Sequence, residues 1–409
     1  MSGDFCGKMV SMENDKPMEW KEKKIALGNA IISCVVVGII FLAIGLNFRN
    51  WFGGFLPYLG FDAGGEPDWS ELDEVYNKLA TTYNGDISKE QAVEGAKKGL
   101  TDSLGDVYTV YMDAEEAEQF EDDLHGNVGA GIGVEMGLRD GYVRVLRTLP
   151  DNPARKVGIL AGDILYKVNG EEVYQLTTDE ITNKVRGEVG TEVEVTVVRD
   201  GKEKTFKMKR ETINNVSAYM DYDGKTAIIT VTRFDDDTGR MVESFANELK
   251  DKGSKKVILD LRGNGGGYVT AAQDLLSLWL DGDSILLQKS KHFGDSDMKA
   301  RNGKAVLKDM KTVVLVNGST ASASEIVAGA LQDYKKATIV GETTYGKGVV
   351  QNLYNISDGA KLKVTTAAWY TPKDRSINGT GIEPDVKVER SFEDINAMRD
   401  PQMDKAKKL

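Results

Sequence analysis

The sequence predicts an α/β fold: a C-terminal domain on a mixed α+β sheet, an inserted strand-rich domain, a small N-terminal helical unit and one transmembrane helix. Three observations lead to this prediction. Beyond Lys225, continuous apolar runs alternate with helical stretches, as in a buried sheet with helical crossovers. Residues 126–210 contain short strands separated by glycine-rich turns. Residues 25–46 form a long uncharged segment.

The uncharged segment runs from Ile25 to Leu46. At about 1.5 Å per residue, a helix of this length crosses a hydrocarbon core of roughly 30 Å. Three lysines lie just before it and a single arginine lies close behind it, so the positive-inside bias predicts a cytoplasmic N-terminus at 1–24. A cleaved signal peptide is the alternative, but its apolar region would span about 7 to 15 residues. We therefore expect an uncleaved single-pass anchor, with the rest of the chain outside.

The bulk properties narrow the function classes. A chain of 409 residues predicts two or three domains. The formal net charge of -12, without a basic cluster among aromatics, argues against a nucleic-acid partner. Cys6 and Cys34 are the only cysteines, so the chain beyond the anchor has no disulfide framework.

Two short regions connect the anchor to the folded domains. Residues 47–68 are rich in glycine and aromatics without a clear period, which is typical of a linker. Residues 69–125 carry helical signals, among them Ser88-Lys-Glu-Gln91, the pattern of a capping box that opens a helix. We expect a small helical region here.

Residues 126–210 are expected to form a separate domain of short strands. Thr178–Val185 has a helical pattern, and two strands around Asp200-Gly201 read as a closing hairpin. Residues 211–390 follow as the α/β domain, with strands such as Lys256–Leu261 and Thr312–Val316. Residues 391–409 are a charged C-terminal tail.

Ser322 is the first candidate for chemistry. The turn Ser-Thr-Ala-Ser-Ala-Ser places it where a helix begins, so free backbone N–H groups, notably that of Ala323, would stabilise an oxyanion. A structural alternative exists, because Ser322-Ala-Ser-Glu325 is itself a capping box. The spacing also leaves open whether Ser319, Ser322 or Ser324 is the reactive serine.

Lys347 is the candidate base. It lies between two glycines in an apolar, strand-like neighbourhood, and from a reference pKa of about 10.4 only about 0.04 % would be neutral at pH 7. Burial without a carboxylate partner would lower that pKa. Gln351, four residues later, points to the same face of an extended strand and is a candidate to orient the amine. An exposed strand face is the structural alternative for both.

A glycine-rich strand end supplies a second oxyanion candidate. Asp260-Leu-Arg-Gly-Asn-Gly-Gly-Gly267 permits close backbone approach, and the N–H of Gly266 is the preferred donor among Gly265 to Gly267. A phosphate-binding loop would need a different glycine spacing and a following Lys-Ser/Thr. The two histidines, His125 and His292, lie in polar stretches, so a Ser-His-Asp triad is disfavoured and Ser-Lys chemistry is favoured.

The motifs together resemble a known family. Residues 126–210 are similar to a PDZ domain, in which Gly131, Ile132, Gly133 and Val134 would hold a peptide C-terminus. From about Asp68 to Arg390, the chain resembles the carboxyl-terminal processing peptidases. The resemblance rests on five motifs in this order: Gly-Ile-Gly-Val, Asp-Leu-Arg-Gly-Asn-Gly-Gly-Gly, Ser-Ala-Ser-Glu-Ile, Gly-Lys-Gly-x-x-Gln and Gly-Thr-Gly-Ile-Glu-Pro-Asp.

The resemblance implies a membrane-anchored bacterial serine endopeptidase whose PDZ domain gates the active site. Carried over by position, Ser322 is its nucleophile, Lys347 its general base and Gln351 its base-orienting residue. No metal or cofactor is implied, and His-Glu-x-x-His is absent. Asp106-Val-Tyr-Thr departs from the family's Asp-Pro-Tyr-Ser.

The implied partners are proteins or peptides with accessible C-termini and the cell membrane. A catalytically silent PDZ scaffold at the membrane surface is the alternative function. The sequence leaves the oligomeric state open, a homo-oligomer included.

Overall fold

A computed structural model of the chain describes residues 69–139, 141–397 and 399–409. The chain divides into two compact units, one through Ile87 and one from Ser88 to Leu409. Within the described residues, no helix has the length and apolar character that a membrane span requires. The predicted anchor at 25–46, its cytoplasmic flank at 1–24 and the linker at 47–68 lie outside the described residues.

The first unit contributes one described helix, α2 (Ser70–Thr82). Its apolar residues Leu72, Val75 and Leu79 are spaced three and four apart, as on one face of a helix, and all three are exposed. No residue of this helix is buried.

The second unit begins with α3 (Lys89–Asp102), β1 (Val110–Met112) and α4 (Ala114–His125). The predicted cap at Ser88 is confirmed, because its hydroxyl accepts the N–H of Gln91 at 3.2 Å. Gly126, at φ 71°, ends α4 in the left-handed conformation. Because α3 contacts β1, and β1 pairs with β18 of the C-terminal region, a separate helical unit over 69–125 is not confirmed.

The strand-rich domain is built on a sheet of order β3-β4-β5-β7-β8, with β6 at the side. Its helix α6 (Thr178–Val185) has the predicted bounds. The predicted hairpin is also confirmed, since Arg199 pairs with Lys202 across Asp200 and Gly201, both at positive φ. The elements are β2 (Ala130–Gly131), β3 (Val134–Arg139), β4 (Tyr142–Thr148), α5 (Pro153–Val157), β5 (Ile164–Val168), β6 (Glu171–Glu172), β7 (Glu192–Arg199), β8 (Lys202–Lys209) and β9 (Glu211–Thr212).

The C-terminal domain contains the predicted mixed sheet, in the order β10-β11-β12-β15-β16-β19. β10 runs antiparallel to β11 and the other neighbours are parallel. The strands are β10 (Ala218–Asp223), β11 (Thr226–Val231), β12 (Lys256–Asp260), β15 (Lys311–Val316), β16 (Ala337–Gly341) and β19 (Val386–Lys387). The helices are α7 (Thr238–Asp251), α8 (Val269–Leu276) and α9 (Ala323–Asp333).

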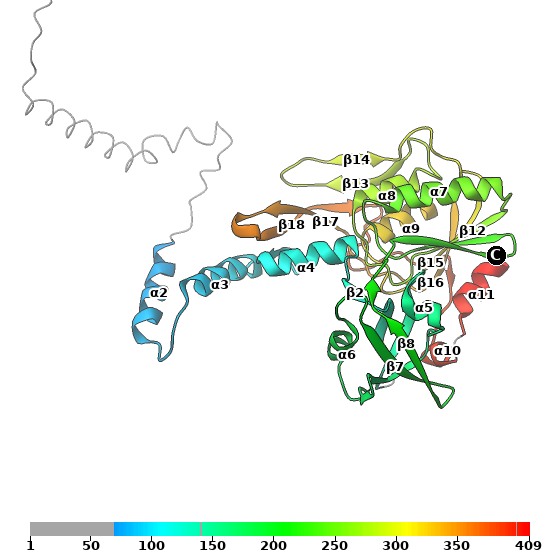
Figure 1. Cartoon of the computed structure of the whole chain (residues 1–409). Helices are drawn as coiled ribbons and strands as arrows, with labels where there is room; N and C mark the ends of the chain where they lie inside the picture. The colour runs from blue at the N-terminus through cyan, green and yellow to red at the C-terminus, as the bar shows by residue number, and fades with distance from the viewer. Residues whose placement is uncertain (1–68, 140, 398) are drawn as a thin grey trace, which may run out of the picture. The chain divides into compact units, whose positions relative to one another are not determined.

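Both faces of this sheet are covered, which explains its continuous apolar strands. Along β12, Val257 and Leu259 join the large core beneath α7, α8 and α9, while Ile258 joins a smaller core on the opposite face. That smaller core is closed by Ala406 of α11 (Pro401–Lys408). The charged segment 391–409, which also holds α10 (Phe392–Asn396), is thus docked on the sheet (Figure 1).

A second sheet stands beside the first and holds part of the cleft described below. It has the order β1-β18-β13-β14, and β17 pairs with β18. β13 (Ser284–Lys289), β14 (Ser296–Lys299), β17 (Val349–Asn355) and β18 (Lys361–Tyr370) are its C-terminal strands. The β17–β18 hairpin lies along α4 (Figure 1), where Lys361 forms an ion pair with Glu121.

Candidate active site

Ser322 occupies the turn between β15 and α9 in a conformation that is unusual for a side-chain-bearing residue, φ 56° and ψ -119°. The turn is fastened to the glycine-rich loop that follows β12. The Thr320 hydroxyl donates to the carbonyl of Leu261 at 2.9 Å, and the N–H of Ala321 donates to the carbonyl of Asn264 at 3.0 Å. These contacts hold Ser322 at the positive end of α9.

The three candidate serines have different environments. Ser319 is exposed, whereas Ser324 is fully buried and its hydroxyl donates to the carbonyl of Asn264 at 3.1 Å. Of the three, Ser322 lines a cavity of about 400 Å³. The geometry therefore favours Ser322 as the serine at the cavity.

Glu325 ties the serine turn to the lysine loop. Its carboxylate is fully buried, and Oε2 accepts the N–H groups of Ser322 and Lys347, both at 2.9 Å. Oε1 accepts the N–H of Gly346 at 2.7 Å and the hydroxyl of Thr344 at 2.5 Å. The capping-box pattern predicts a Ser322–Glu325 pair, and this pair is present through the N–H of Ser322. The same carboxylate also positions the backbone of Lys347.

The glycine-rich loop lies directly against the serine. Gly266 has φ 107°, and a Cβ on it would lie 2.7 Å from Cβ of Ser322 and 3.1 Å from the nitrogen of Ala323. Only glycine permits this approach. The N–H of Gly266, the preferred oxyanion donor from the sequence, donates to Oδ1 of Asn264 at 2.8 Å and is therefore already engaged.

Lys347 lies between β16 and β17, with its carbonyl accepting the indole N–H of Trp369 at 2.9 Å. Its amine lies 5.2 Å from the ring centroid of Tyr108, and no described ion pair joins it to a carboxylate. Burial lowers the pKa of Lys347, the charge of Lys363 lowers it further, and Asp106 and Glu325 oppose the change. A lowered pKa favours the neutral amine that a general base requires.

Gln351 lines the same cavity, but it is not bonded to Lys347 among the described hydrogen bonds. Its side-chain amide donates to the carbonyl of Tyr108. A bulge interrupts β17 between Val350 and Gln351, so the simple alternation expected from Lys347 is broken at this point.

Tyr108 and Lys363 reach the site although the sequence singled out neither. Tyr108 belongs to the segment Asp106-Val-Tyr-Thr, which is held by Asp106 accepting the hydroxyl of Thr109 at 2.7 Å. Lys363 extends from β18 into the cavity. The departure of Asp106-Val-Tyr-Thr from the family pattern is the signal in the sequence that lies nearest to Tyr108.

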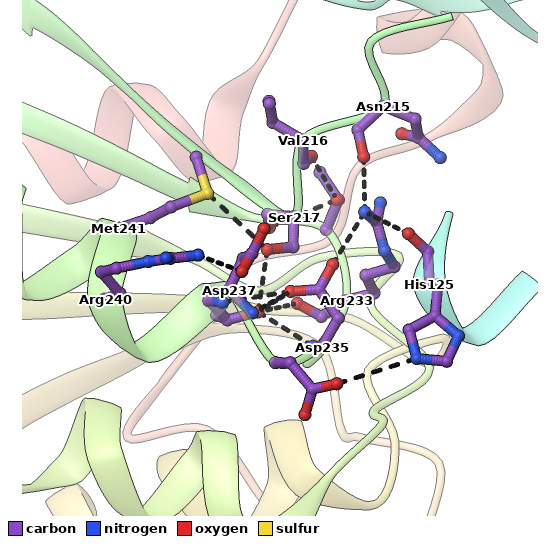
Figure 2. A network of polar contacts seen from close by, with 12 residues as sticks. His125, Asn215, Val216, Ser217, Arg233, Asp235, Asp237, Arg240 and Met241 are labelled. Atoms are coloured by element: carbon purple, nitrogen blue, oxygen red, sulfur yellow. Dashed lines mark hydrogen bonds and ion pairs between the residues drawn. The ribbon is translucent and has the colours of Figure 1, made fainter. Parts of the chain in front are cut away.

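Arg233 connects the cleft to the end of the strand-rich domain. Its guanidinium donates to the carbonyls of His125, at 3.1 Å, and Asn215, and it lies 2.8 Å from the carboxylate of Asp235 (Figure 2). Burial alone would raise the pKa of Asp235, but hydrogen bonds from Ser217 and Thr238 and the charge of Arg233 outweigh it, so the pKa is lowered.

A second groove lies in the strand-rich domain. Gly131, Ile132, Gly133 and Val134, the predicted peptide-binding residues, line a cavity of about 360 Å³. Residues of α6 and of the segment after β9, including Asn215, line it as well. A groove between a strand and a helix is the geometry in which a peptide adds to a sheet edge.

The buried side-chain amide of Asn152 joins the groove to the segment that follows β9. Asn152 packs against Gly133, whose added Cβ would lie 2.2 Å from Cβ of Asn152. The amide of Asn152 donates to the carbonyl of Asn214 at 2.8 Å and accepts the N–H of Asn214 at 3.0 Å.

Comparisons with known proteins agree with this architecture. Residues 225–388 match peptidase family S41, residues 130–209 match the PDZ domain, and residues 62–116 match the N-terminal domain of the activating protease CtpB. Among solved structures, a photosystem II D1 C-terminal processing protease has a TM-score of 0.51 and 26% identity, covering 81% of this chain and 90% of its own. A putative S41 protease from Bacteroides fragilis shares the fold at a TM-score of 0.53, with 15% identity, 72% of this chain and 82% of its own.

Curated relatives extend over most of the chain. A probable CtpA-like serine protease of Staphylococcus epidermidis is 33% identical over 382 residues, which are 93% of this chain and 77% of the relative. A protein of the same description from Staphylococcus aureus is 32% identical over 93% of this chain and 75% of its own. The resemblance read from the motifs is confirmed: the chain belongs to the peptidase S41 family of serine proteases, with a PDZ domain, alongside the CtpA-like proteases.

Proposed function

We propose that the chain is a Ser-Lys endopeptidase, in which Ser322 is the nucleophile and Lys347 the general base. The observation that carries this proposal is that both residues line one cavity of about 400 Å³. Ser322 lies at the N-terminus of a helix, and Lys347 is an amine of lowered pKa without a described carboxylate partner. These are the two properties that the reaction requires.

The reaction proceeds through an acyl-enzyme. Oγ of Ser322 bonds to the carbonyl carbon of the scissile peptide while its proton moves to Nζ of Lys347. The carbon–nitrogen bond then breaks, and the leaving amine takes that proton. Water attacks the ester, gives a proton to Lys347, and the ester bond breaks as Ser322 recovers its proton. The products are a carboxylic acid and an amine.

The N–H groups of Ala323 and Gly266 stabilise the oxyanion in this proposal. Ala323 is the first residue of α9, so its N–H has no partner within the helix. Before it can donate to the oxyanion, the N–H of Gly266 must release its hydrogen bond to Oδ1 of Asn264. Gln351 holds the carbonyl of Tyr108 through its amide nitrogen, so its amide oxygen is the atom that would accept a hydrogen bond from Lys347. In this proposal the described arrangement, with Gly266 engaged, is the resting one.

The PDZ domain recognises substrate C-termini and shifts the catalytic site from the resting to the active arrangement. The likeness to a D1 C-terminal processing protease supports substrates that are processed near their C-termini. The contacts of Asn152 with Asn214, and of Arg233 with Asn215, support a route from groove to cleft.

The test of the dyad compares hydrolysis of fluorescein-labelled casein by the full chain and its variants. We expect Ser322→Ala and Lys347→Ala to lower the rate by about 1,000-fold or more, because each removes a group that acts in the transition state. Ser319→Ala, which removes the exposed hydroxyl three residues upstream, should retain activity. Equal hydrolysis by all four proteins would contradict the dyad, and no hydrolysis by the wild type would favour a silent PDZ scaffold.

The site of action follows from the apolar segment 25–46. As a single-pass anchor with a cytoplasmic N-terminus, it would hold the protease domain outside the bacterial cell membrane. Cell fractionation with external protease treatment of intact spheroplasts tests this placement. Full-length chain in the soluble fraction, or a protease domain protected inside spheroplasts, would contradict it.

A further inference from the structure

A second lysine shares the proposed catalytic cavity. Lys363 lies on β18 opposite Leu353 of β17, and it lines the same cavity as Ser322, Lys347 and Gln351. Its side chain is partly buried, and its amine lies 4.9 Å from the ring centroid of Phe120 on α4. Position and packing therefore direct this amine toward the cleft.

Lys363 differs from its neighbour on the same strand. Lys361, two residues earlier, forms an ion pair with Glu121 of α4. For Lys363 and Lys347, no ion pair with a carboxylate is found in the part of the chain that the structure describes. Asp123, the acidic residue among those that line the cavity, is exposed. Two amines therefore face one cavity without a neutralising partner.

Two amines that line one partly buried site do not both hold a proton easily. Each positive charge makes protonation of the other less favourable, and the effect grows as water is excluded. The amine that loses its proton first is available as a base while the other remains charged.

We propose that Lys363 is a positioning residue: its amine faces the cavity that Lys347 also lines, and its positive charge favours the neutral form of Lys347. This inference rests on the proposed function, in which Lys347 is the general base. Lys363 itself forms no bond to substrate in this role. It acts only through the electrostatic environment of Lys347.

The electrostatic balance at the two amines agrees with this role. After burial, the charge of Lys363 is the largest influence that lowers the pKa of Lys347. Burial also lowers the pKa of Lys363. Several titratable and charged groups surround the pair. Arg233, which is paired with Asp235, and Tyr268 line the cavity together with Asp123 of α4. The others are Asp106 and Tyr108 from the segment before β1, Glu325 from α9, Tyr345 next to the lysine loop, and the Lys361–Glu121 pair.

The proposal predicts the direction in which the pH profile of kcat/KM moves when Lys363 is replaced. Activity needs neutral Lys347, so kcat/KM rises with pH through the pKa of that amine in the free enzyme. Removing the neighbouring cation raises that pKa and moves the rising limb to higher pH. A purely structural role for Lys363 would lower the rate without moving the limb.

The experiment measures kcat/KM for fluorescein-labelled casein from about pH 6 to pH 10, using the full chain. For Lys363→Met, which retains the apolar stem against Phe120, we expect the midpoint of the rising limb to move upward by about one pH unit. The rate near pH 7 should fall about tenfold and recover at high pH. Lys363→Arg keeps the charge and should keep the midpoint of the wild type.

Each outcome decides the inference. An unchanged midpoint in Lys363→Met overturns it, as does a higher KM alone, which would assign Lys363 to substrate binding. Lys363→Gln serves if the methionine variant does not fold, with near-ultraviolet circular dichroism as the check. If the wild type does not cleave casein, or if Lys347→Ala is as active as the wild type, the proposed dyad fails instead.

Discussion

Ser322 is held in a backbone conformation that a residue with a side chain rarely adopts. The surrounding bonds maintain it: Thr320 and Ala321 are tied to the loop after β12, and Glu325 accepts the N–H of Ser322. Such strain, kept by several independent contacts, is typical of functional sites. The serine is thereby positioned before substrate arrives.

Glu325 provides the residue-scale prediction. Its two oxygens accept four donors, so Glu325→Gln would turn an amide NH₂ toward N–H groups that need an acceptor. We expect the free energy of unfolding to fall by about 2–4 kcal/mol, because buried donors lose their partners. Urea denaturation measures this change, with Glu383→Gln as the matched control at a residue that the structure describes as exposed.

A second consequence of Glu325→Gln concerns activity. Because the carboxylate positions the backbone of both Ser322 and Lys347, casein hydrolysis should fall even at temperatures where the variant is fully folded. If Glu325→Gln has the stability and the hydrolysis rate of the wild type, the four hydrogen bonds of Glu325 are unimportant for both folding and activity.

Residue identities were predictable from the sequence where the local pattern is sufficient. The Ser-rich turn and Gly-Lys-Gly mark a candidate serine cluster and Lys347, and the family resemblance points to Ser322 within that cluster. The choice among Ser319, Ser322 and Ser324 was open, because all three lie in one turn and differ only in what covers them. Burial and the bond from Ser324 to Asn264 distinguish them in the folded chain.

At the scale of elements, the site is assembled where strands of the two sheets end. The loop after β12 meets the turn after β15, since these two strands are parallel neighbours. Carboxyl ends of parallel strands share an edge, which brings Gly266 against Ser322. The second sheet adds the lysine loop before β17 and Lys363 on β18.

Gly266 provides the element-scale prediction. Gly266→Ala would place a methyl group 2.7 Å from Cβ of Ser322 at φ 107°, so the turn must shift. We expect casein hydrolysis to fall by about 100-fold or more, since small displacements of a nucleophile are costly. The matched control is Gly263→Ala in the same loop, where φ is 74° and an added Cβ meets open space.

The two glycine variants separate placement of the serine from backbone strain. Gly263→Ala should lose about 1–2 kcal/mol of stability from its left-handed conformation and retain most of its activity. Equal losses of activity in both variants would contradict the proposed contact between Gly266 and Ser322.

Gln351 illustrates why element boundaries limit sequence reasoning. Its spacing from Lys347 predicts a shared face of one regular strand, but β17 begins only at Val349 and contains a bulge before Gln351. A bulge turns the side chains that follow it. Its amide consequently reaches the carbonyl of Tyr108.

At the scale of the whole molecule, the PDZ groove and the catalytic cleft share one connecting segment. Asn214 is held by Asn152 beside the peptide-binding loop, and Asn215 is held by Arg233 at the edge of the cleft. Arg233 is followed by Phe234, whose N–H donates to the carbonyl of Gly266 at 2.9 Å. A displacement of the segment at one end therefore has a physical route to the other.

The molecular-scale prediction concerns activation by a free peptide. A short peptide with an apolar C-terminal residue should stimulate casein hydrolysis by the full chain, because the proposed gating requires the peptide to bind the active arrangement better than the resting one. The same peptide with an amidated C-terminus is the matched control, since it lacks the carboxylate that Gly131 to Val134 would hold. Asn152→Ala should reduce the ratio of stimulated to unstimulated rates toward one.

Contrary results would be informative in different ways. Equal stimulation by the acid and the amide would exclude carboxylate recognition by the groove. Full stimulation of Asn152→Ala would exclude the Asn152–Asn214 contact as the coupling element while leaving peptide binding intact.

By itself, the sequence determined the α/β domain, the PDZ domain and the family, and it supplied the candidate reactive residues, because apolar periodicity, turn residues and motif order are local properties of the chain. Only the tertiary structure decided which partners surround those residues. Tyr108 and Gln351, 243 positions apart, meet through one hydrogen bond, and Lys363 faces the cavity of Lys347 only because β18 pairs with β17. Such contacts depend on how distant segments pack, and packing assembles the charges around Lys347 that govern its pKa.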